Sequence, residues 1–196
     1  MAIEAAAPDG KPMLTVEHAD DLDAWLVEHH ERPSGVWLVR ARPGSDHPRV
    51  AYEDMITVLL SYGWIDASIK VLDERRSLLW ISPRRKGSVW SKPNKERIVR
   101  LEAAGRMRPA GAAAIQRAKD DGSWTTIDGP ENLEVPDDLA AAFDDDPGAR
   151  ANFDAFPPSA RKGYLASIAM AKTPTTRARR IATTVERSRA NQRPGS

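Results

Sequence analysis

The chain contains no cysteine. This absence excludes disulfide bonds, thiolate catalysis and zinc sites with thiolate ligands. No apolar run approaches the roughly 18 to 20 residues that a membrane-spanning helix needs, so we expect no transmembrane segment. The first residues, MAIEAAAPDGKP, have neither the basic start nor the apolar middle of a signal peptide. We therefore expect a cytoplasmic protein.

Sequence motifs of enzymes and metal sites are also missing. The four histidines, His18, His29, His30 and His47, lack the H-x-x-x-H and H-E-x-x-H spacings, so we expect no metal ion. The nucleophile motif G-x-S-x-G is absent, as are the phosphate-binding Walker A and G-x-G-x-x-G loops. The sequence predicts no cofactor and favours a non-catalytic protein, although it leaves an enzyme open.

Charge is plentiful but unevenly distributed along the chain. The net charge is only +1, yet residues 1–69 carry −7, 70–119 carry +10, 120–158 carry −10 and 159–196 carry +8. One interpretation is that the basic and acidic segments pack beside each other within the fold. The other is that the basic segments form a surface for phosphates or nucleic acid.

Hydrophobic periodicity predicts an α+β protein. The β-branched and aromatic run at 36–41 predicts a buried strand. Alternation predicts a second strand at 64–72, and 77–82 returns as its antiparallel partner in a hairpin. Period-3.6 patterns predict helices at 18–30, 51–63, 91–104, 109–122, 137–145, 147–155, 158–171 and 174–190. Residues 1–13 are expected to form a disordered leader.

These elements predict two modules joined by a linker. The first module, 14–120, has a small mixed or antiparallel sheet flanked by helices. Residues 121–136 form an acidic linker, and 137–190 form a helical C-terminal module.

The segment PRRKGSVWSKPN has the composition of an anion-binding loop. The basic residues 84–86 and then Gly87 and Ser88 precede a predicted helix that Ser91 caps. The free N–H groups at a helix N-terminus attract phosphate or carboxylate, and Trp90 offers a ring for stacking. Alternatively, the arginines pair with acidic segments of the same chain and Trp90 lies in the core.

The segment GWIDASIK, residues 62–70 with the preceding tyrosine, adds two charged residues. Strand alternation puts Asp66 and Lys70 on the same face as Trp64, and they lie roughly 13 Å apart at about 3.3 Å per residue. They cannot pair with each other at that separation. Asp66 then either contributes to a binding pocket or pairs with Arg84 or Arg85.

The predicted binding face combines the two segments. Its residues are Trp64, Asp66, Lys70, Arg84, Arg85, Ser88, Trp90 and Ser91.

The last predicted helix is basic and amphipathic. Thr173 or Thr175 caps it, and it carries Arg177, Arg179, Arg180, Arg187 and Arg189. Such a helix binds nucleic acid, an acidic partner or an anionic membrane surface. Alternatively, it faces water or the acidic segment 120–158.

Four motifs together resemble those of the YdeI/OmpD-associated family, whose members are often labelled bacteriocin-protection proteins. The motifs are YGWIDASIK, SPRRKGSVWSKPNKERIVRLEAAGRMRPAG, AIQRAKDDGSW and SARKGYLASIAMAKTPTTRARRI. The resemblance runs from about Trp25 to about Ile181. It implies protection against peptide antibiotics and, for some members, a link to an outer-membrane porin. It brings no set of catalytic residues.

The leading hypothesis is a cytoplasmic, non-catalytic resistance or stress-protection protein. It binds a small anionic or aromatic molecule, or a protein partner, at the predicted binding face. The alternative is a nucleic-acid-binding protein that uses segments 70–119 and 159–196. A second alternative is an enzyme with Asp66 as general acid or base. The sequence leaves the oligomeric state open.

Overall fold

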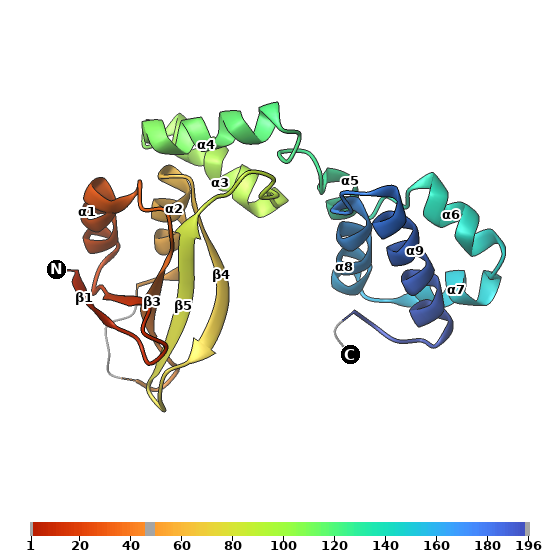
Figure 1. Ribbon diagram of the computed structural model, residues 1–196, viewed down its shortest axis with the longest axis horizontal. Coiled ribbons are helices and arrows are strands. Elements are labelled where there is room, and N and C mark those ends of the chain that lie inside the picture. Colours follow the sequence, from red (N-terminus) through yellow and green to blue (C-terminus); the bar gives the residue numbers. More distant parts are fainter. Residues whose placement is uncertain (1, 46–49, 195–196) are drawn as a thin grey trace. The chain divides into compact units, whose positions relative to one another are not determined.

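The computed structural model describes residues 2–45 and 50–194 (Figure 1). They form two compact units: unit 1 comprises Met1–Ser88 and Pro93–Asp121, and unit 2 comprises Val89–Lys92 and Gly122–Ser196. Unit 1 contains a five-stranded sheet with helices, whereas the described part of unit 2 is helical. The predicted α+β class with a helical C-terminal part is confirmed.

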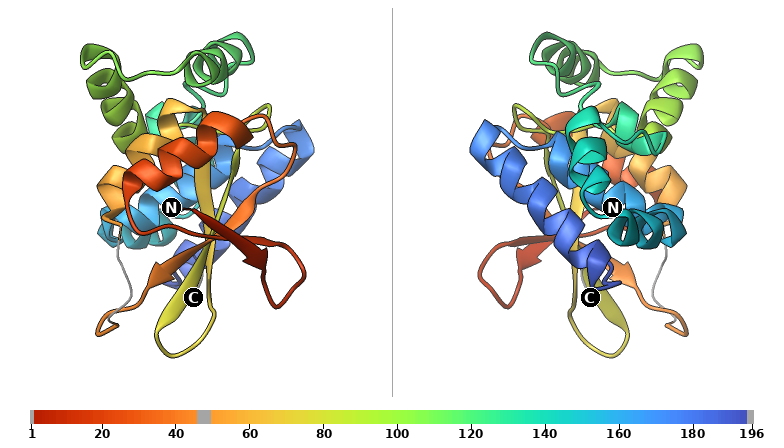
Figure 2. Two further views of the ribbon diagram at one scale, coloured as in Figure 1. Left: turned by 90° about the vertical axis from the view of Figure 1, so that its left-hand side faces the viewer. Right: turned by 90° about the vertical axis from the view of Figure 1, so that its right-hand side faces the viewer.

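A mixed sheet forms the centre of unit 1, with the strand order β1-β2-β3-β5-β4. The strands are β1 Ile3–Ala6, β2 Pro12–Thr15, β3 Val36–Ala41, β4 Trp64–Val71 and β5 Arg76–Pro83. Neighbouring strands are antiparallel except β2 and β3, which are parallel. Figure 2 shows the strong twist of this sheet, with β1 crossing the direction of the β4–β5 hairpin.

The N-terminal residues form a β-hairpin, so the prediction of a disordered leader at 1–13 is wrong. The turn between β1 and β2 is held by Asp9, which accepts hydrogen bonds from Trp37 Nε1 at 3.0 Å and Lys70 Nζ at 2.7 Å. The bond from Lys70 is the main reason that the pKa of Asp9 falls to about 2. Because both partners lie far along the chain, no local pattern in residues 1–13 could indicate this order.

Two helices cover one face of the sheet. They are α1 Ala19–His29 and α2 Tyr52–Ser61, which pack on each other, while α2 also packs on β4. Both helices have an apolar stripe at helical spacing, as the sequence predicted. Among the fully buried side chains are Leu22, Leu26, Met55, Ile56, Leu59 and Leu60.

Helix α4, Pro109–Asp120, follows α3, Lys92–Ala103, and packs very closely against the end of α2. A Cβ atom on Gly111 would lie 2.2 Å from the carbonyl oxygen of Ser61. The same oxygen accepts a hydrogen bond from the backbone N–H of Arg108 at 3.2 Å. This contact fixes the start of α4, and therefore the segment before it, beside α2.

Unit 2 is a helical bundle with its own aromatic core. Its helices are α5 Asp128–Glu131, α6 Asp137–Asp144, α7 Pro147–Ala155, α8 Pro158–Ala169 and α9 Pro174–Arg189. Thr173 caps α9, since its hydroxyl accepts from the N–H of Thr176 at 3.2 Å. The core side chains include Leu139, Phe143, Phe153, Tyr164, Leu165 and Ile168.

Opposite charges pair within each unit, which confirms the first interpretation of the charge pattern. In unit 1 the ion pairs include Lys70–Asp9, Arg97–Glu53 and Arg108–Asp23. In unit 2 they include Lys162–Glu131, Arg177–Asp138 and Arg189–Asp146. Each basic block is therefore partly neutralised by an acidic block that precedes it in the sequence.

We expect Gly111→Ala to destabilise unit 1. In an unhindered helix this change stabilises by up to about 1 kcal/mol, but here the new methyl group meets backbone, and overpacking costs roughly 1–3 kcal/mol. Urea unfolding followed by circular dichroism measures the difference. The matched control is Gly148→Ala in α7, whose Cβ would make an ordinary 3.5 Å contact. Equal stability of the two variants would contradict the close packing of α4 on α2.

Candidate functional site

The two tryptophans of the predicted binding face are buried. Trp64 is 0% exposed, its Nε1 donates to the backbone oxygen of His30 at 3.0 Å, and its ring lies edge-on to Trp25. Trp90 is 1% exposed and belongs to unit 2, where its ring packs on Trp124. Both rings therefore serve the core rather than a solvent-facing site.

A β-bulge separates Asp66 from Lys70. Asp66 is paired in register with Ile81, but Ile69 is paired with Leu79, so the register shifts between them. Because one extra residue reverses the alternation of side chains, the two charged groups lie on opposite faces of the sheet. The prediction that they share a face is wrong.

The surroundings of the two side chains agree with this. Asp66 accepts a hydrogen bond at 3.1 Å from the hydroxyl of Tyr52 in α2. The Lys70 ammonium lies 4.2 Å from the ring centre of Trp37 and pairs with Asp9. Lys70 is thus engaged with the N-terminal hairpin.

Arg84 and Asp66 are brought near each other. Arg84 is 8% exposed, and burial lowers the pKa of its guanidinium to about 10, while the negative charge of Asp66 acts in the opposite direction. This arrangement agrees with the alternative interpretation of the sequence, in which the carboxylate of Asp66 offsets the charge of a basic-loop arginine.

The basic loop itself binds an internal carboxylate. Gly87 has φ +77°, and its N–H donates to Asp121 at 2.9 Å. The Ser88 hydroxyl accepts from the N–H of Arg85 at 3.1 Å, and the Arg85 side chain is exposed. Ser91 is half-buried, precedes α3 and belongs to unit 2. The structure thus groups Asp66 with Arg84 and places Lys70 elsewhere.

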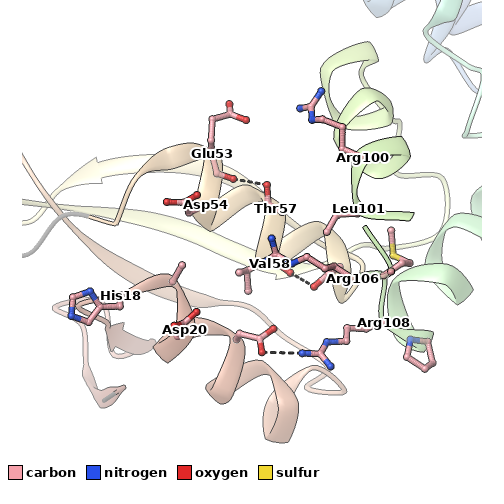
Figure 3. Close-up of a pocket in the computed structure, with 16 residues that line it drawn as sticks. His18, Asp20, Glu53, Asp54, Thr57, Val58, Arg100, Leu101, Arg106 and Arg108 are labelled. Atoms are coloured by element: carbon pink, nitrogen blue, oxygen red, sulfur yellow. Dashed lines mark hydrogen bonds and ion pairs between the residues drawn. The ribbon is translucent and has the colours of Figure 1, made fainter. Parts of the chain in front are cut away.

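Unit 1 contains a cavity at a place that the sequence did not indicate (Figure 3). We call it the α1–α2 cleft, and its volume is about 850 Å³. Carboxylates from α1 and α2 line one side, and arginines from α3 and the segment before α4 line the other. The charged lining residues are Asp20, Asp23, Glu53, Asp54, Arg100, Arg106 and Arg108.

Helix geometry explains the acidic side of the cleft. Asp20 lies in the first turn of α1, and Glu53 and Asp54 lie in the first turn of α2. Acidic side chains at these positions interact favourably with the unpaired N–H groups of a helix N-terminus. The carboxylates therefore lie at the cleft because they stabilise the N-terminal turns of the two helices that border it.

A turn after α3 explains the basic side. The N–H of Gly105, with φ +64°, donates to Glu102 O at 3.0 Å, and the N–H of Arg106 donates to Leu101 O at 2.9 Å. This Schellman arrangement ends α3 and reverses the chain. Arg106 and Arg108 lie two positions apart in the short segment that leads to Pro109, the first residue of α4.

Three of the cleft's charged residues, Asp23, Glu53 and Arg108, are already paired. Arg108 donates to Asp23 at 3.1 Å, which joins the basic and acidic sides. Glu53 accepts from Arg97 Nε at 3.0 Å, and this bond, assisted by the charges of Arg97 and Arg100, lowers the pKa of Glu53.

The other four charges remain available. Asp20, Asp54, Arg100 and Arg106 form no ion pair with any residue in the described ranges 2–45 and 50–194. The cleft can therefore offer two carboxylates and two guanidinium groups to a ligand.

Two family models match different parts of the chain. Residues 14–114, just over half of it, match the family model described as Domain of unknown function (DUF8412). The chain belongs to this family. The DUF8412 match includes every residue that lines the α1–α2 cleft. No curated protein and no solved structure matches the chain.

Residues 132–191 match a second family model, described as Bacteriocin-protection, YdeI or OmpD-Associated. The resemblance drawn from the sequence is therefore confirmed for the C-terminal part. The motifs around GWID and the basic loop fall instead in the DUF8412 match, so the expected extent from Trp25 was too wide.

Within 2–45 and 50–194, no group of three or more His, Asp and Glu side chains is arranged to hold a metal ion; His47 lies outside these ranges. In the same part of the chain, every helix is too short or too polar to cross a membrane.

We expect Asp66→Asn to lower the free energy of unfolding by about 1 kcal/mol, because the buried Arg84 guanidinium then loses the nearby negative charge. Urea unfolding measures the change. Glu74→Gln, an exposed change in the β4–β5 turn, serves as control and should stay within about 0.5 kcal/mol. A stability unchanged by Asp66→Asn would exclude this structural role for the carboxylate.

Proposed function

We propose that this protein is a non-catalytic, cytoplasmic protection protein that binds a small peptide-like molecule in the α1–α2 cleft. The observation that supports this most directly is the separation of charge in the cleft. Asp20 and Asp54 are offered from the α1 and α2 side, and Arg100 and Arg106 from the α3 side.

This separation favours a ligand that carries charges of both signs. Carboxylates accept hydrogen bonds from an ammonium group, and arginines donate paired hydrogen bonds to a carboxylate. A purely anionic ligand would gain from Arg100 and Arg106 but would meet repulsion from Asp20 and Asp54. The small anionic molecule expected from the sequence therefore becomes, in this proposal, one with an added cationic group.

The size of the cleft is compatible with such a ligand. Small-molecule sites commonly measure about 300–1,000 Å³, and the cleft measures about 850 Å³. A tripeptide with free ends, which has an ammonium at one end and a carboxylate at the other, has the corresponding charge pattern.

The C-terminal family match supports the protective role. Its description names bacteriocin protection, and bacteriocins are peptide antibiotics. Binding a peptide fragment or a peptide-like compound would link this role to the charge pattern of unit 1. Cell fractionation with an antibody against the protein would check the cytoplasmic location.

We expect trialanine with free ends to bind more tightly than its N-acetylated or C-amidated form, since each capped form loses one charge. Replacing Arg106 by Gln should weaken binding of the free peptide about tenfold, because hydrogen bonds to charged groups contribute about 1.5–3 kcal/mol. Asp54→Asn should have a similar effect. Chemical-shift titration by NMR gives the affinities.

The control for these variants is Arg117→Gln. Arg117 is exposed on α4 and does not line the cleft, so its loss removes the same charge without touching the proposed site. Equal affinity for free and capped peptides, or an equal loss of peptide affinity in Arg106→Gln and Arg117→Gln, would refute the proposal.

Nucleic-acid binding through 70–119 and 159–196 is the alternative. Several arginines of these segments are held in ion pairs, including Arg97, Arg177 and Arg189. The second alternative, catalysis with Asp66 as acid or base, stays a prediction.

A salt titration distinguishes the peptide proposal from the nucleic-acid alternative. Between about 50 and 200 mM salt, binding dominated by 6–10 phosphate contacts falls by roughly 10³–10⁵. We expect trialanine affinity to fall by less than about tenfold and a duplex oligonucleotide to bind only weakly at the lower salt concentration. Tight oligonucleotide binding with a steep salt dependence would favour the alternative.

A further inference from the structure

A second pocket lies in unit 2, between α8 and α9, and has a volume of about 300 Å³. Three arginines of α9, namely Arg179, Arg180 and Arg187, line it. The lining also includes the hydroxyl residues Tyr164 and Ser167 of α8. Among the described residues that line this pocket there is no Asp or Glu, which distinguishes it from the α1–α2 cleft.

The periodicity of α9 explains why these arginines converge. Arg179, Thr183 and Arg187 follow one another at intervals of four, so they lie along one row of the helix surface. Arg180 lies on the adjacent row, and its Nη1 donates to the backbone oxygen of Ser167 in α8. Both rows therefore face the pocket, and the guanidinium group of Arg180 is anchored to the neighbouring helix.

The remaining arginines of α9 are used differently. Arg177 pairs with Asp138, and Arg189 pairs with Asp146. Arg179 and Arg187, by contrast, form no ion pair within the part of the chain that the structure describes. The helix thus separates its arginines into two that stabilise unit 2 and a group of three around a cavity.

Three positive charges around one cavity repel one another, and none of the described lining residues is acidic and could compensate them. An oxyanion in the pocket would remove this repulsion and accept several charge-assisted hydrogen bonds, for which the planar guanidinium fork is well suited. Burial raises the pKa of Tyr164, and the positive charge of Arg187 beside it offsets part of this rise.

We propose that the α8–α9 pocket binds a phosphate group, either free or carried by a small molecule. Arg179 and Arg187 bind the oxyanion directly, and Arg180, held against α8, adds a fixed positive charge. The volume of about 300 Å³ admits a phosphate with a few further atoms. All of these residues belong to unit 2, so this site is independent of the peptide-like ligand proposed for the cleft.

The test uses the full chain and inorganic phosphate, followed through the arginine Nε–H signals in NMR. We expect millimolar phosphate to shift the signals of Arg179 and Arg187. Arg179→Gln and Arg187→Gln should each weaken phosphate binding at least about tenfold, as expected for loss of a charge-assisted hydrogen bond. Phosphoserine, as a phosphate on a small carrier, distinguishes the two sources by its affinity relative to the free ion.

Arg189→Gln is the matched control, because it removes the same charge from the same helix at a side chain that does not line the pocket. Binding should change by less than about twofold in this variant. Absence of any phosphate-induced shift, or an equal loss in Arg189→Gln, would overturn the proposal. So would a duplex oligonucleotide that binds through Arg179 and Arg187 far more tightly than phosphate or phosphoserine.

Discussion

Pairing of opposite charges inside each unit determines which charged groups of this protein remain available to a ligand. Glu53 and Asp23 are each held by an arginine in unit 1, and Asp138 and Asp146 are held by α9 in unit 2. Exposed ion pairs contribute little to stability, about 0–1 kcal/mol each. Their larger consequence here is to leave small, well-defined groups of charges uncompensated beside cavities.

The two cavities differ in which charged side chains of their lining remain unpaired. The α1–α2 cleft keeps carboxylates and guanidinium groups on opposite sides, whereas the α8–α9 pocket keeps guanidinium groups alone. The former lies within the DUF8412 match, and most of the latter lies within the bacteriocin-protection match. The two family matches therefore coincide with two chemically distinct candidate sites.

Local sequence rules predicted most of the elements correctly. The apolar stripes of α1 and α2 depend only on residues a few positions apart, and so does the cap of α9, which the sequence placed at Thr173 or Thr175. The N-terminal hairpin was missed because Asp9 finds its partners in β3 and β4. The opposite faces of Asp66 and Lys70 were missed because a bulge is set by pairing with β5.

The sequence alone determined the fold class and the positions of most helices, because hydrophobic periodicity is readable over short distances. It also contained the signal for the basic side of the cleft, in the residues GRMRP at 105–109. Only the tertiary structure decided that this segment faces the first turns of α1 and α2. That outcome depends on the close contact of Gly111 with Ser61, and such a contact exists only once distant helices have packed.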